Sequence, residues 1–402
     1  MPVVPLSSAR SPGRHGASNE QTRRHNLSIV LTALHQHGAQ PRANLTARSG
    51  LNRSTTAALV AELAARGLVF ETDPGKAGQV GRPSPTVHPD PSNVAFAVNP
   101  EVDAITVGVV ALGGRVVRRV RHPTTQTASV DEAIQIIVAI IERLRIELGA
   151  SVRVAGIGVA IPGLVRSGDG VVRFAPHLGW RDAPFAQLLA DATGERVAVG
   201  NDASLGAVAE KIFGAGRGMS DIVYLNGGAS GIGGGVIAGG TLLRGAGGYA
   251  GEFGHIRVVG GAASRDRAEE GSLEAAVNRA DLLRALCLET ADADELDGAL
   301  AASTDSAVIA LVRRQLDYLS IALRNAVNVL NPQVVVLGGF LASIFQVDPA
   351  YLRERVAEQS LAPAVECVTI TCALLGSDLL MIGAAELAFA GLLSDPVGTI
   401  GR

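Results

Sequence analysis

Six polar side chains of this chain could together bind a ligand that carries several hydroxyl groups. Each hydroxyl of such a ligand needs one acceptor and one donor, and carboxylates, an amide and imidazoles supply both. Each residue could instead be an ordinary structural polar group, as a lone buried histidine usually is. The six residues are His177, Asn201, Asp202, Glu252, His255 and Glu274.

A second group of residues, near the N-terminus, could contact DNA. A predicted helix opens with four polar side chains that could reach base edges in the major groove: Arg53, Ser54, Thr55 and Thr56. Further basic residues could contact phosphates or the minor groove: Arg23, Arg24, Arg42, Arg48, Lys76 and Arg82. The tripeptide Gly81-Arg82-Pro83 could equally be an ordinary linker turn.

The elements that would position this second group form a recognisable series. Apolar spacing and turn residues predict three helices, a strand and a wing. The helices are expected over Asn19–His37, Arg42–Ser49 and Arg53–Arg66, the strand at Leu68–Glu71 and the wing at Asp73–Pro85. Gly50 suits a tight turn and Asn52 suits a helix N-cap. This order is typical of a winged helix-turn-helix, which we treat as an N-terminal all-α domain. A small helical bundle used for dimerisation is the alternative.

The six ligand-binding candidates fall in a longer α/β region. Strands and helices alternate there in two successive sets, which predicts a body of two lobes with its ligand site between them, at the carboxyl ends of strands. The first set includes strands at Val94–Val98, Ile105–Val110, Val116–Val120, Val154–Ile161 and Val197–Val199, and helices at Val130–Leu148 and Pro184–Thr193. The second begins with a helix at Ser204–Phe213 and a strand at Ile222–Leu225, and ends with a helix at about Leu379–Leu393.

Bulk composition limits the class of protein. At 402 residues the chain is long enough for two or three domains. No run of 18 uncharged apolar residues stands out, which argues against a membrane span. Cys287, Cys367 and Cys372 are scattered, which indicates a reducing cytoplasm and no disulfide framework. Residues 1–18 lack an apolar signal-peptide core, and we expect a disordered tail.

The net charge is divided unevenly along the chain. Residues 1–90 hold ten basic and five acidic residues, a net +5, while the other 25 basic and 33 acidic residues give −8. We therefore expect only the N-terminal part to bind a polyanion.

Four motifs give the α/β region a resemblance to a known family. They are Asn201-Asp202-Ala203, Ser230-Gly231-Ile232-Gly233-Gly234-Gly235, Gly251-Glu252-Phe253-Gly254-His255, and Asn331-Pro332 before Val336-Leu337-Gly338-Gly339. In this combination and order they resemble the ROK family of sugar kinases and sugar-responsive repressors. The N-terminal helix-turn-helix resembles the repressor branch. The resemblance implies an actin-like, ribonuclease H-like sugar-kinase fold of two α/β lobes.

The same resemblance implies roles for the polar candidates. Asn201, Asp202, Glu252, His255 and Glu274 correspond to sugar contacts, and His177 stands where many of the family's kinases have Asn. Asp202 resembles the kinases' general base, which would take the proton from the attacking sugar hydroxyl.

Two departures from the family pattern argue against kinase chemistry. Where the family has its first phosphate loop, Asp-x-Gly-Gly-Thr, this chain reads Asn99-Pro100-Glu101-Val102-Asp103. The glycines that let phosphate approach the backbone are replaced, and the carboxylates of Glu101 and Asp103 would repel a triphosphate. The retained run Gly231–Gly235 could simply be required by a tight β-hairpin. We therefore expect no ATP binding.

The second departure concerns a structural zinc site. The family follows its Gly-His motif with three cysteines, which bind zinc together with the histidine. The corresponding residues here are Arg265, Arg267 and Ser272, none of which is a zinc ligand. We therefore expect no bound metal, and His255 would be available to the sugar.

The sequence thus predicts a non-enzymatic, sugar-responsive transcriptional regulator, a probable repressor. We expect a tail (1–18), a DNA-binding domain (19–85), a first lobe (86–203, completed by a helix at about 377–394) and a second lobe (204–376). The expected partners are a palindromic DNA operator and a sugar, with a homodimer or a dimer of dimers as the assembly. An active sugar kinase with an accessory DNA-binding domain, and a regulator controlled by a protein partner, are the alternatives.

Overall fold

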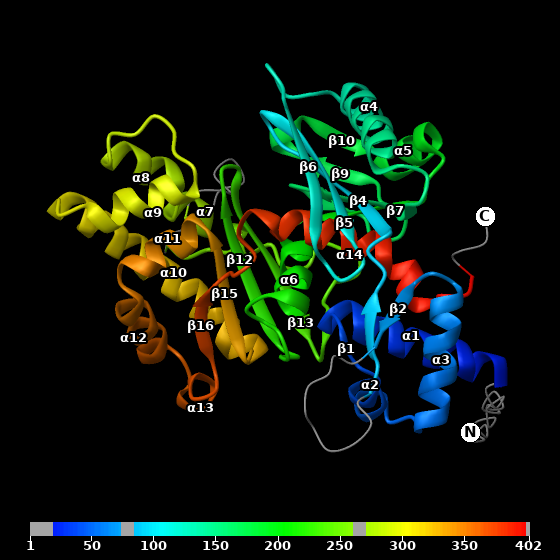
Figure 1. Cartoon of the computed structure of the whole chain (residues 1–402). Helices are drawn as coiled ribbons and strands as arrows, with labels where there is room; N and C mark the ends of the chain where they lie inside the picture. The colour runs from blue at the N-terminus through cyan, green and yellow to red at the C-terminus, as the bar shows by residue number, and fades with distance from the viewer. Residues whose placement is uncertain (1–18, 74–83, 260–270, 399–402) are drawn as a thin grey trace, which may run out of the picture. The chain divides into compact units, whose positions relative to one another are not determined.

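The computed structural model describes residues 19–73, 84–259 and 271–398. The chain divides into two compact units (Figure 1). The N-terminal unit comprises the residues up to Pro89 together with those from Leu392 onward, and the body comprises Asp90–Gly391. Each unit has its own hydrophobic interior and is described separately below.

Three helices and a small sheet build the N-terminal unit. Its elements are α1 (Asn19–His37), β1 (Gln40–Pro41), α2 (Arg42–Ser49), α3 (Arg53–Ala65), β2 (Val69–Thr72) and β3 (Thr86–Pro89). Gly50 ends α2 in the left-handed region at φ 67°, and Asn52 caps α3 by accepting a hydrogen bond from the Thr55 amide. Leu31, Leu45 and Leu63 are fully or almost fully buried between the helices.

The sheet corrects two sequence-based expectations. The strands run in the order β1-β3-β2, with β3 antiparallel to both neighbours. Val87, at the centre of β3, is fully buried. The unit is therefore not all-α, and it extends past residue 85 to Pro89, because the pairing of β3 attaches residues 86–89 to this unit.

The first lobe of the body is a five-stranded mixed sheet in the order β11-β7-β4-β5-β6. The strands are β4 (Asn93–Pro100), β5 (Ala104–Ala111), β6 (Val116–Pro123), β7 (Arg153–Ile161) and β11 (Val197–Asn201). The helices α4 (Val130–Leu148) and α5 (Phe185–Thr193) pack on the sheet in one apolar cluster. A small sheet of β8 (Leu164–Val165), β9 (Val172–Ala175) and β10 (Trp180–Ala183) follows β7.

The second lobe repeats this plan, with its sheet in the order β14-β13-β12-β15-β16. Its strands are β12 (Ile222–Gly228), β13 (Gly231–Ala238), β14 (Thr241–Leu242), β15 (Val334–Gly339) and β16 (Thr369–Cys372). In both lobes the strand that comes first in the chain is central, an antiparallel meander lies on one side of it, and parallel strands lie on the other. The ribonuclease H-like order expected for the body is thus present twice.

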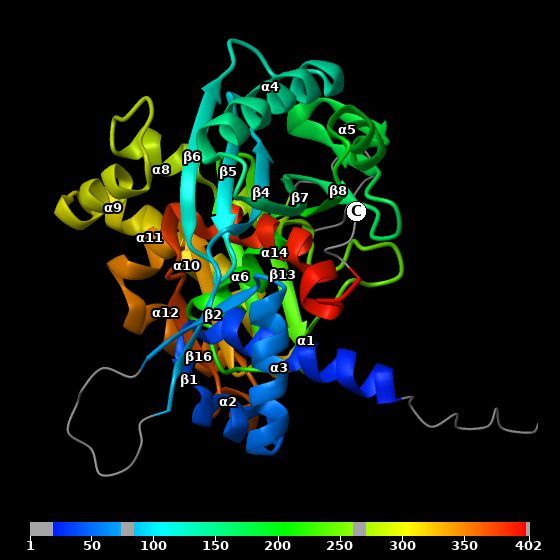
Figure 2. The same ribbon diagram turned by 45° about the vertical axis from the view of Figure 1, so that its right-hand side comes forward.

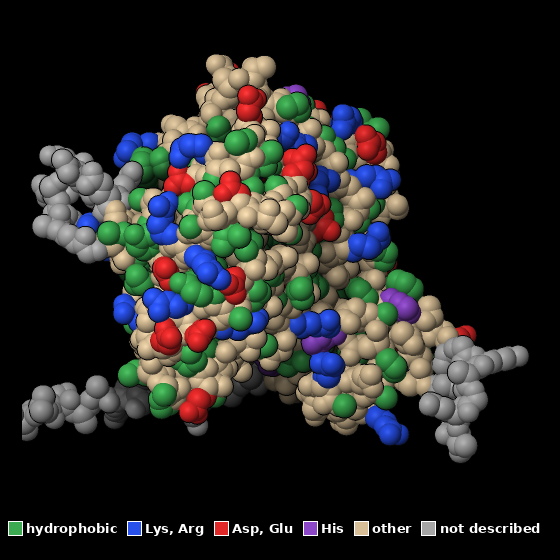
Figure 3. Space-filling view, turned by 90° about the vertical axis from the view of Figure 1, so that its left-hand side faces the viewer, with side chains coloured by type: hydrophobic (Ala, Val, Ile, Leu, Met, Phe, Trp, Pro, Cys, Tyr) green, Lys and Arg blue, Asp and Glu red, His purple; other side chains and the backbone are tan. Residues whose placement is uncertain are grey.

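In the described residues of this lobe, seven helices cover the outer face of the second sheet or extend from it: α7 (Leu273–Ala276), α8 (Arg279–Ala285), α9 (Ala293–Ala302), α10 (Ser306–Leu330), α11 (Phe340–Val347), α12 (Pro349–Gln359) and α13 (Ala362–Val365). Acidic, basic and apolar side chains are interspersed on the side of the body where α9 and α12 lie (Figure 3).

Two helices, α6 (Asp202–Phe213) and α14 (Leu379–Ser394), lie between the two sheets. A Cβ at Gly158 of β7 would overlap the Ala384 carbonyl, and one at Gly383 would lie 2.5 Å from the Leu205 carbonyl oxygen. These glycines therefore let α14 pack directly on β7 and α6 (Figure 2). The stretch Gly376–Ser394 is long and apolar enough to cross a membrane, but 61% of its most apolar window is buried, as in the core helix of a globular body.

Candidate functional site

Asn201 and Asp202 stand where β11 ends and α6 begins. The Asn201 side chain caps α6 by accepting a hydrogen bond from the Ser204 amide at 2.8 Å, and it donates to the Gly163 carbonyl at 3.2 Å. Oδ1 of Asp202 accepts a hydrogen bond from the Ala203 backbone amide at 2.7 Å and one from the side-chain Nδ2 of Asn201 at 3.2 Å. The Asp202 carboxyl is therefore held in one orientation at the end of a strand.

The Asp202 carboxyl lies deep among protein atoms, although the residue as a whole is only half-buried. The pKa of Asp202 is raised from 3.8 to about 7, mainly by burial and also by the nearby Glu252 carboxylate, against the lowering effect of the hydrogen bond from the Ala203 backbone. Burial also raises the pKa of Glu252, with Glu274 adding to the rise and His255 opposing it. These two carboxyls thus share one electrostatic environment.

The second lobe contributes the rest of the polar cluster. His255 ends the short helix η2 (Phe253–His255), and its Nδ1 lies 3.4 Å from Oε1 of Glu274, in the first turn of α7. An added Cβ would lie 2.6 Å from Oε2 of Glu274 at Gly231 and 3.0 Å from it at Gly254. The Glu274 carboxylate therefore rests against two glycine backbones, and Gly231 has a φ of +131°, which favours glycine.

The structure brings five of the six predicted ligand-binding residues together, namely Asn201, Asp202, Glu252, His255 and Glu274. His177 lies on the exposed helix η1 (Pro176–Leu178), which follows Ala175. Ala175 packs close to Gly163, whose carbonyl contacts Asn201. His177 is thus near the cluster along the chain, but among the described residues it has no recorded contact with the carboxylates.

A residue that sequence reasoning missed is Arg244. It lines a cavity of about 20 Å³ together with Asn201, Ser204 and Gly248. This space holds about one water molecule, so a sugar entering here would have to widen it. The signal in the sequence was a single arginine before the glycine-rich stretch Gly245–Gly248.

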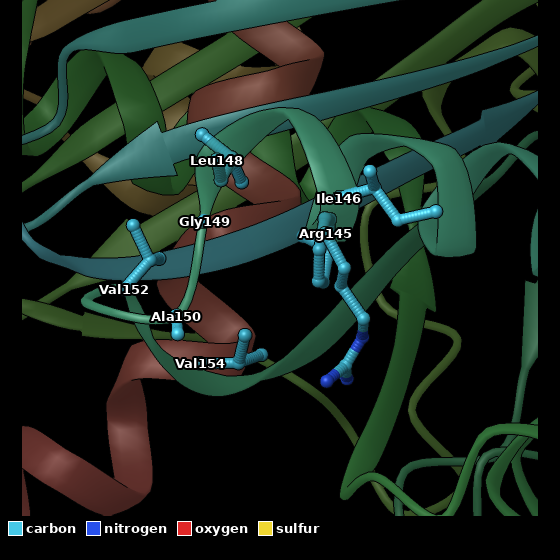
Figure 4. A pocket seen from close by; sticks show the side chains of 8 residues that line it. Arg145, Ile146, Leu148, Gly149, Ala150, Val152 and Val154 are labelled. Carbon is cyan, nitrogen blue, oxygen red and sulfur yellow. The ribbon is translucent and has the colours of Figure 1, made fainter.

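Wider pockets occur elsewhere. One of about 450 Å³ lies at the end of α4, lined by residues that include Arg145, Ile146 and Val154 (Figure 4). It contains none of the six predicted residues, and its polar lining offers a single guanidinium. We therefore place the candidate ligand site at the carboxylate cluster and not at this pocket.

The turn between β4 and β5 carries the acidic residues expected from the sequence. The Glu101 amide donates to the Ala104 carbonyl at 2.7 Å, and the Glu101 side chain accepts from the Thr106 hydroxyl at 3.4 Å. Burial raises the pKa of Glu101, while Arg121 lowers it. Arg121 also forms an ion pair with Asp103 at 2.7 Å. The turn thus presents two carboxylates with one partner guanidinium, a poor fit to the phosphates of a nucleotide.

The glycine-rich segment after β12 forms a β-hairpin with β13. A Cβ at Gly233 would lie 2.8 Å from the Ala203 Cβ, and one at Gly235 would lie 2.6 Å from the Ala207 Cβ. On the opposite face, a Cβ at Gly234 would lie 2.5 Å from the Phe253 ring. Packing of α6 and η2 against the hairpin therefore accounts for these glycines without a phosphate.

The residues around His255 do not fit the family's zinc site. Ser272, which stands at one of its cysteine positions, is buried, and its hydroxyl caps α7 by accepting from the Ala275 amide at 3.3 Å. Arg265 and Arg267 lie outside the described residues. Within the described part of the chain, no group of three His, Cys, Asp or Glu side chains is arranged to hold a metal ion.

The predicted DNA-contacting residues of the N-terminal unit differ in how exposed they are. Arg53 and Ser54 are exposed on α3, and Thr55 is half-buried. Thr56 is fully buried and its hydroxyl donates to the Asn52 carbonyl, so the expectation that it reaches a base edge was wrong. Lys76, Arg82 and the tripeptide Gly81–Pro83 lie outside the described residues, as does the predicted tail.

The arginines expected at phosphates form ion pairs or hydrogen bonds inside the unit. Arg42 makes a bidentate contact with Glu71 at 2.6 Å, and Arg48 contacts the His37 ring at 3.0 Å. Arg23 pairs with Glu62 at 2.8 Å, and Arg24 with Asp395 at 3.5 Å. Arg42 in particular ties the start of α2 to β2, which is a structural role that sequence reasoning did not foresee.

Comparisons with known proteins agree with this architecture. The chain is 29% identical over 300 residues to a glucokinase of Thermotoga maritima, covering 70% of this chain and 93% of the relative. It is 28% identical over 339 residues to a xylose repressor of Bacillus spizizenii, covering 83% and 86%. The crystal structure of a ROK family transcriptional regulator, a homolog of the E. coli MLC protein, superposes with a TM-score of 0.77 at 22% identity, covering 94% of this chain and 99% of that one.

The glucokinase relative covers 70% of this chain, whereas the regulator structure covers 94% of it. The family model described as ROK family matches residues 96–390, which is most of the body. Both the fold and the motif residues gathered between the lobes agree with that match. This chain therefore belongs to the ROK family.

Proposed function

We propose that the protein is a sugar-responsive, DNA-binding transcriptional regulator, acting as a repressor, whose kinase-like body does not transfer phosphoryl groups. The supporting observation is the pairing of two features in one chain. The N-terminal unit presents a capped, exposed helix α3, and the body carries Glu101 and Asp103 where the family's kinases bind phosphate. The xylose repressor relative covers 83% of this chain, which is more than the body alone.

The carboxylate cluster is the proposed sugar site. Asp202, Glu252 and Glu274 supply acceptors for hydroxyl donors, and the His255 ring supplies a donor. The Asn201 side-chain amide already donates to Gly163 and Asp202, so it orients the Asp202 carboxyl in the site. Residues of the cluster come from both lobes, since Asp202 begins α6 after β11 and Glu274 lies on α7. A bound sugar would contact both lobes, and a regulator needs it to bind one arrangement of the lobes more tightly than another.

The proposed assembly is a homodimer or a dimer of dimers in the cytoplasm, with two copies of α3 reading a palindromic operator. The protein would bind neither ATP nor zinc. Zinc is opposed by the capping role of Ser272, and ATP by the acidic turn at Glu101.

A direct test measures operator affinity by fluorescence anisotropy with and without a panel of mono- and disaccharides. We expect one sugar to change the affinity at least tenfold, and Glu274→Gln to weaken the response to that sugar. Glu358→Gln, on α12, is the matched control and should leave the response unchanged. If no sugar alters operator affinity, the proposed sensing role is wrong.

An active sugar kinase is the second candidate, and two observations favour it. A carboxyl with a pKa of about 7 is well suited to act as a general base at neutral pH, and a glucokinase is among the relatives. The test is ATP consumption with each sugar, before and after Asp202→Asn. Turnover that requires both the sugar and Asp202 would replace the first proposal for the body.

A further inference from the structure

The exposed face of α3 consists of small side chains and one guanidinium. Thr56, Leu59, Val60 and Leu63 form the buried face of this helix. Five other residues of the helix are exposed, namely Arg53, Ser54, Ala58, Ala61 and Ala65. Spacings of three and four residues put the last four on one stripe of the helix, with Arg53 at its N-terminal end. A face of alanines allows close approach to a flat or grooved partner.

Arg53 differs from the other described arginines of its unit. Each of those has a partner: Glu20, Glu62 or Asp395 for Arg23 and Arg24, Glu71 for Arg42, His37 for Arg48 and Glu62 for Arg66. Among the described residues, Arg53 makes no recorded hydrogen bond or ion pair. Its five N–H donors are therefore free for an external acceptor.

The neighbouring polar groups on α3 are already used. The Ser54 hydroxyl donates to Oδ1 of Asn52 at 2.8 Å, and the same oxygen accepts from the Thr55 amide at 2.8 Å. This N-cap arrangement fixes the backbone of the first turn of α3. Arg53 is thus the one long donor that the described face offers, and its backbone is held in place by the cap.

We propose that Arg53 selects a guanine in each half-site of the operator, with thymine methyl groups facing Ala58 and Ala61. Guanine presents O6 and N7 in the major groove, which match two parallel N–H donors of a guanidinium, and alanine side chains suit the thymine methyl. Ala61 lies about 12 Å along the helix from Arg53, or about three to four base steps of ~3.4 Å. This inference rests on the proposed DNA-binding function and adds the base that is read.

The experiment selects duplexes from a random library with the full-length protein and compares wild type, Arg53→Ala, Arg53→Gln and Arg48→Ala. Wild type should enrich half-sites with one invariant guanine. Arg53→Gln should change that position to adenine, since glutamine pairs with adenine in the major groove. Arg48→Ala, the matched control on α2, should keep the wild-type base preferences.

A second measurement tests the contact at the level of atoms. Replacing the selected guanine with 7-deazaguanine removes N7, and it should weaken wild-type binding about 10-fold or more while leaving Arg53→Ala unaffected. Circular dichroism of each variant confirms that it is folded.

The outcomes separate the two proposals. If wild type enriches DNA but Arg53→Ala and Arg53→Gln show the same base preferences, the assignment of Arg53 is wrong while DNA binding stands. If wild type enriches no duplex, both the proposed function and this inference are wrong.

Discussion

Of the two hairpins that resemble the phosphate loops of the family's kinases, only one keeps the family's glycines. The β4–β5 turn has lost its glycines and holds Glu101 and Asp103, whereas the β12–β13 hairpin keeps its glycines. The retained glycines are explained by packing, because Gly233 and Gly235 lie against α6 and Gly234 lies against Phe253. Close packing is therefore enough to require the glycines of one hairpin, whether or not it binds a phosphate.

The largest expected effect tests the packing role of the hairpin. Gly235→Ala would place a Cβ 2.6 Å from the Ala207 Cβ and 3.0 Å from backbone atoms of α6. We expect the free energy of unfolding to fall by about 2–3 kcal/mol, as overpacked cores do. Gly228→Ala, where the nearest atoms are 3.8 Å away, is the control. Equal stability of the two variants in urea unfolding would contradict the packing explanation.

The next prediction concerns Asp202, the first residue of α6, the helix that packs against the same hairpin. Its pKa is raised from 3.8 to about 7, so the folded state retains a proton that the unfolded chain loses. The resulting stability is fully present below pH 4 and is lost as the pH rises through 7. The upper limit is about 4 kcal/mol, and partial exposure reduces our expectation to about 2 kcal/mol.

Asp202→Asn should therefore be about 2 kcal/mol more stable than wild type at pH 8 and equal to it at pH 4, measured by chemical unfolding across this range. Glu142→Gln, on the exposed face of α4, should show no such pH dependence. A constant difference between Asp202→Asn and wild type from pH 4 to pH 8 would show that the carboxyl is not buried as described.

The third prediction concerns a variant in which the β4–β5 turn carries the family's Asp-x-Gly-Gly-Thr sequence. Replacing Asn99, Glu101, Val102 and Asp103 by Asp, Gly, Gly and Thr removes two carboxylates, each opposing a phosphate by about 1 kcal/mol. Affinity for Mg-ATP should rise about 30-fold, measured by isothermal titration calorimetry. Tight Mg-ATP binding by the wild-type protein would show that the acidic β4–β5 turn does not oppose nucleotide binding.

The smallest expected effect comes from the ion pair at the same turn. Arg121 and Asp103 are 50% and 73% exposed, so their pairing is largely screened by water. Arg121→Gln should lower the free energy of unfolding by about 0.5 kcal/mol or less. A loss above about 2 kcal/mol in thermal unfolding would mean that this turn is as tightly packed as the glycine hairpin.

Much of the fold was predictable because its signals are local. The helix Val130–Leu148 has the bounds expected from the sequence, since Ser129 and Glu132 form a capping box at its start and Gly149 follows its end. β1 and β3 were missed because they are two and four residues long and contain prolines. Such strands are defined by their partners, which lie up to 47 residues away in the chain at Gln40 and Val87.

The sequence predicted which residues gather at the candidate site, but not the raised pKa of Asp202. The cluster around Asp202 and Glu274 follows from motif spacing, whereas the raised pKa of Asp202 depends on burial of its carboxyl in the folded chain and on the nearby Glu252. Thr56 could have been assigned correctly, because it lies four and seven residues before Val60 and Leu63 on the apolar stripe of α3. The bidentate pairing of Arg42 with Glu71, 29 residues apart, had no local signal.

α14 begins in the body and ends in the N-terminal unit, where Asp395 contacts Arg24 of α1. The N-terminal unit is therefore assembled from segments translated first and segments translated after the whole body. During synthesis on the ribosome, its final contacts can form only once β16 and α14 have emerged. A nascent chain arrested within the body would therefore hold an N-terminal unit that lacks the segment from Leu392 onward.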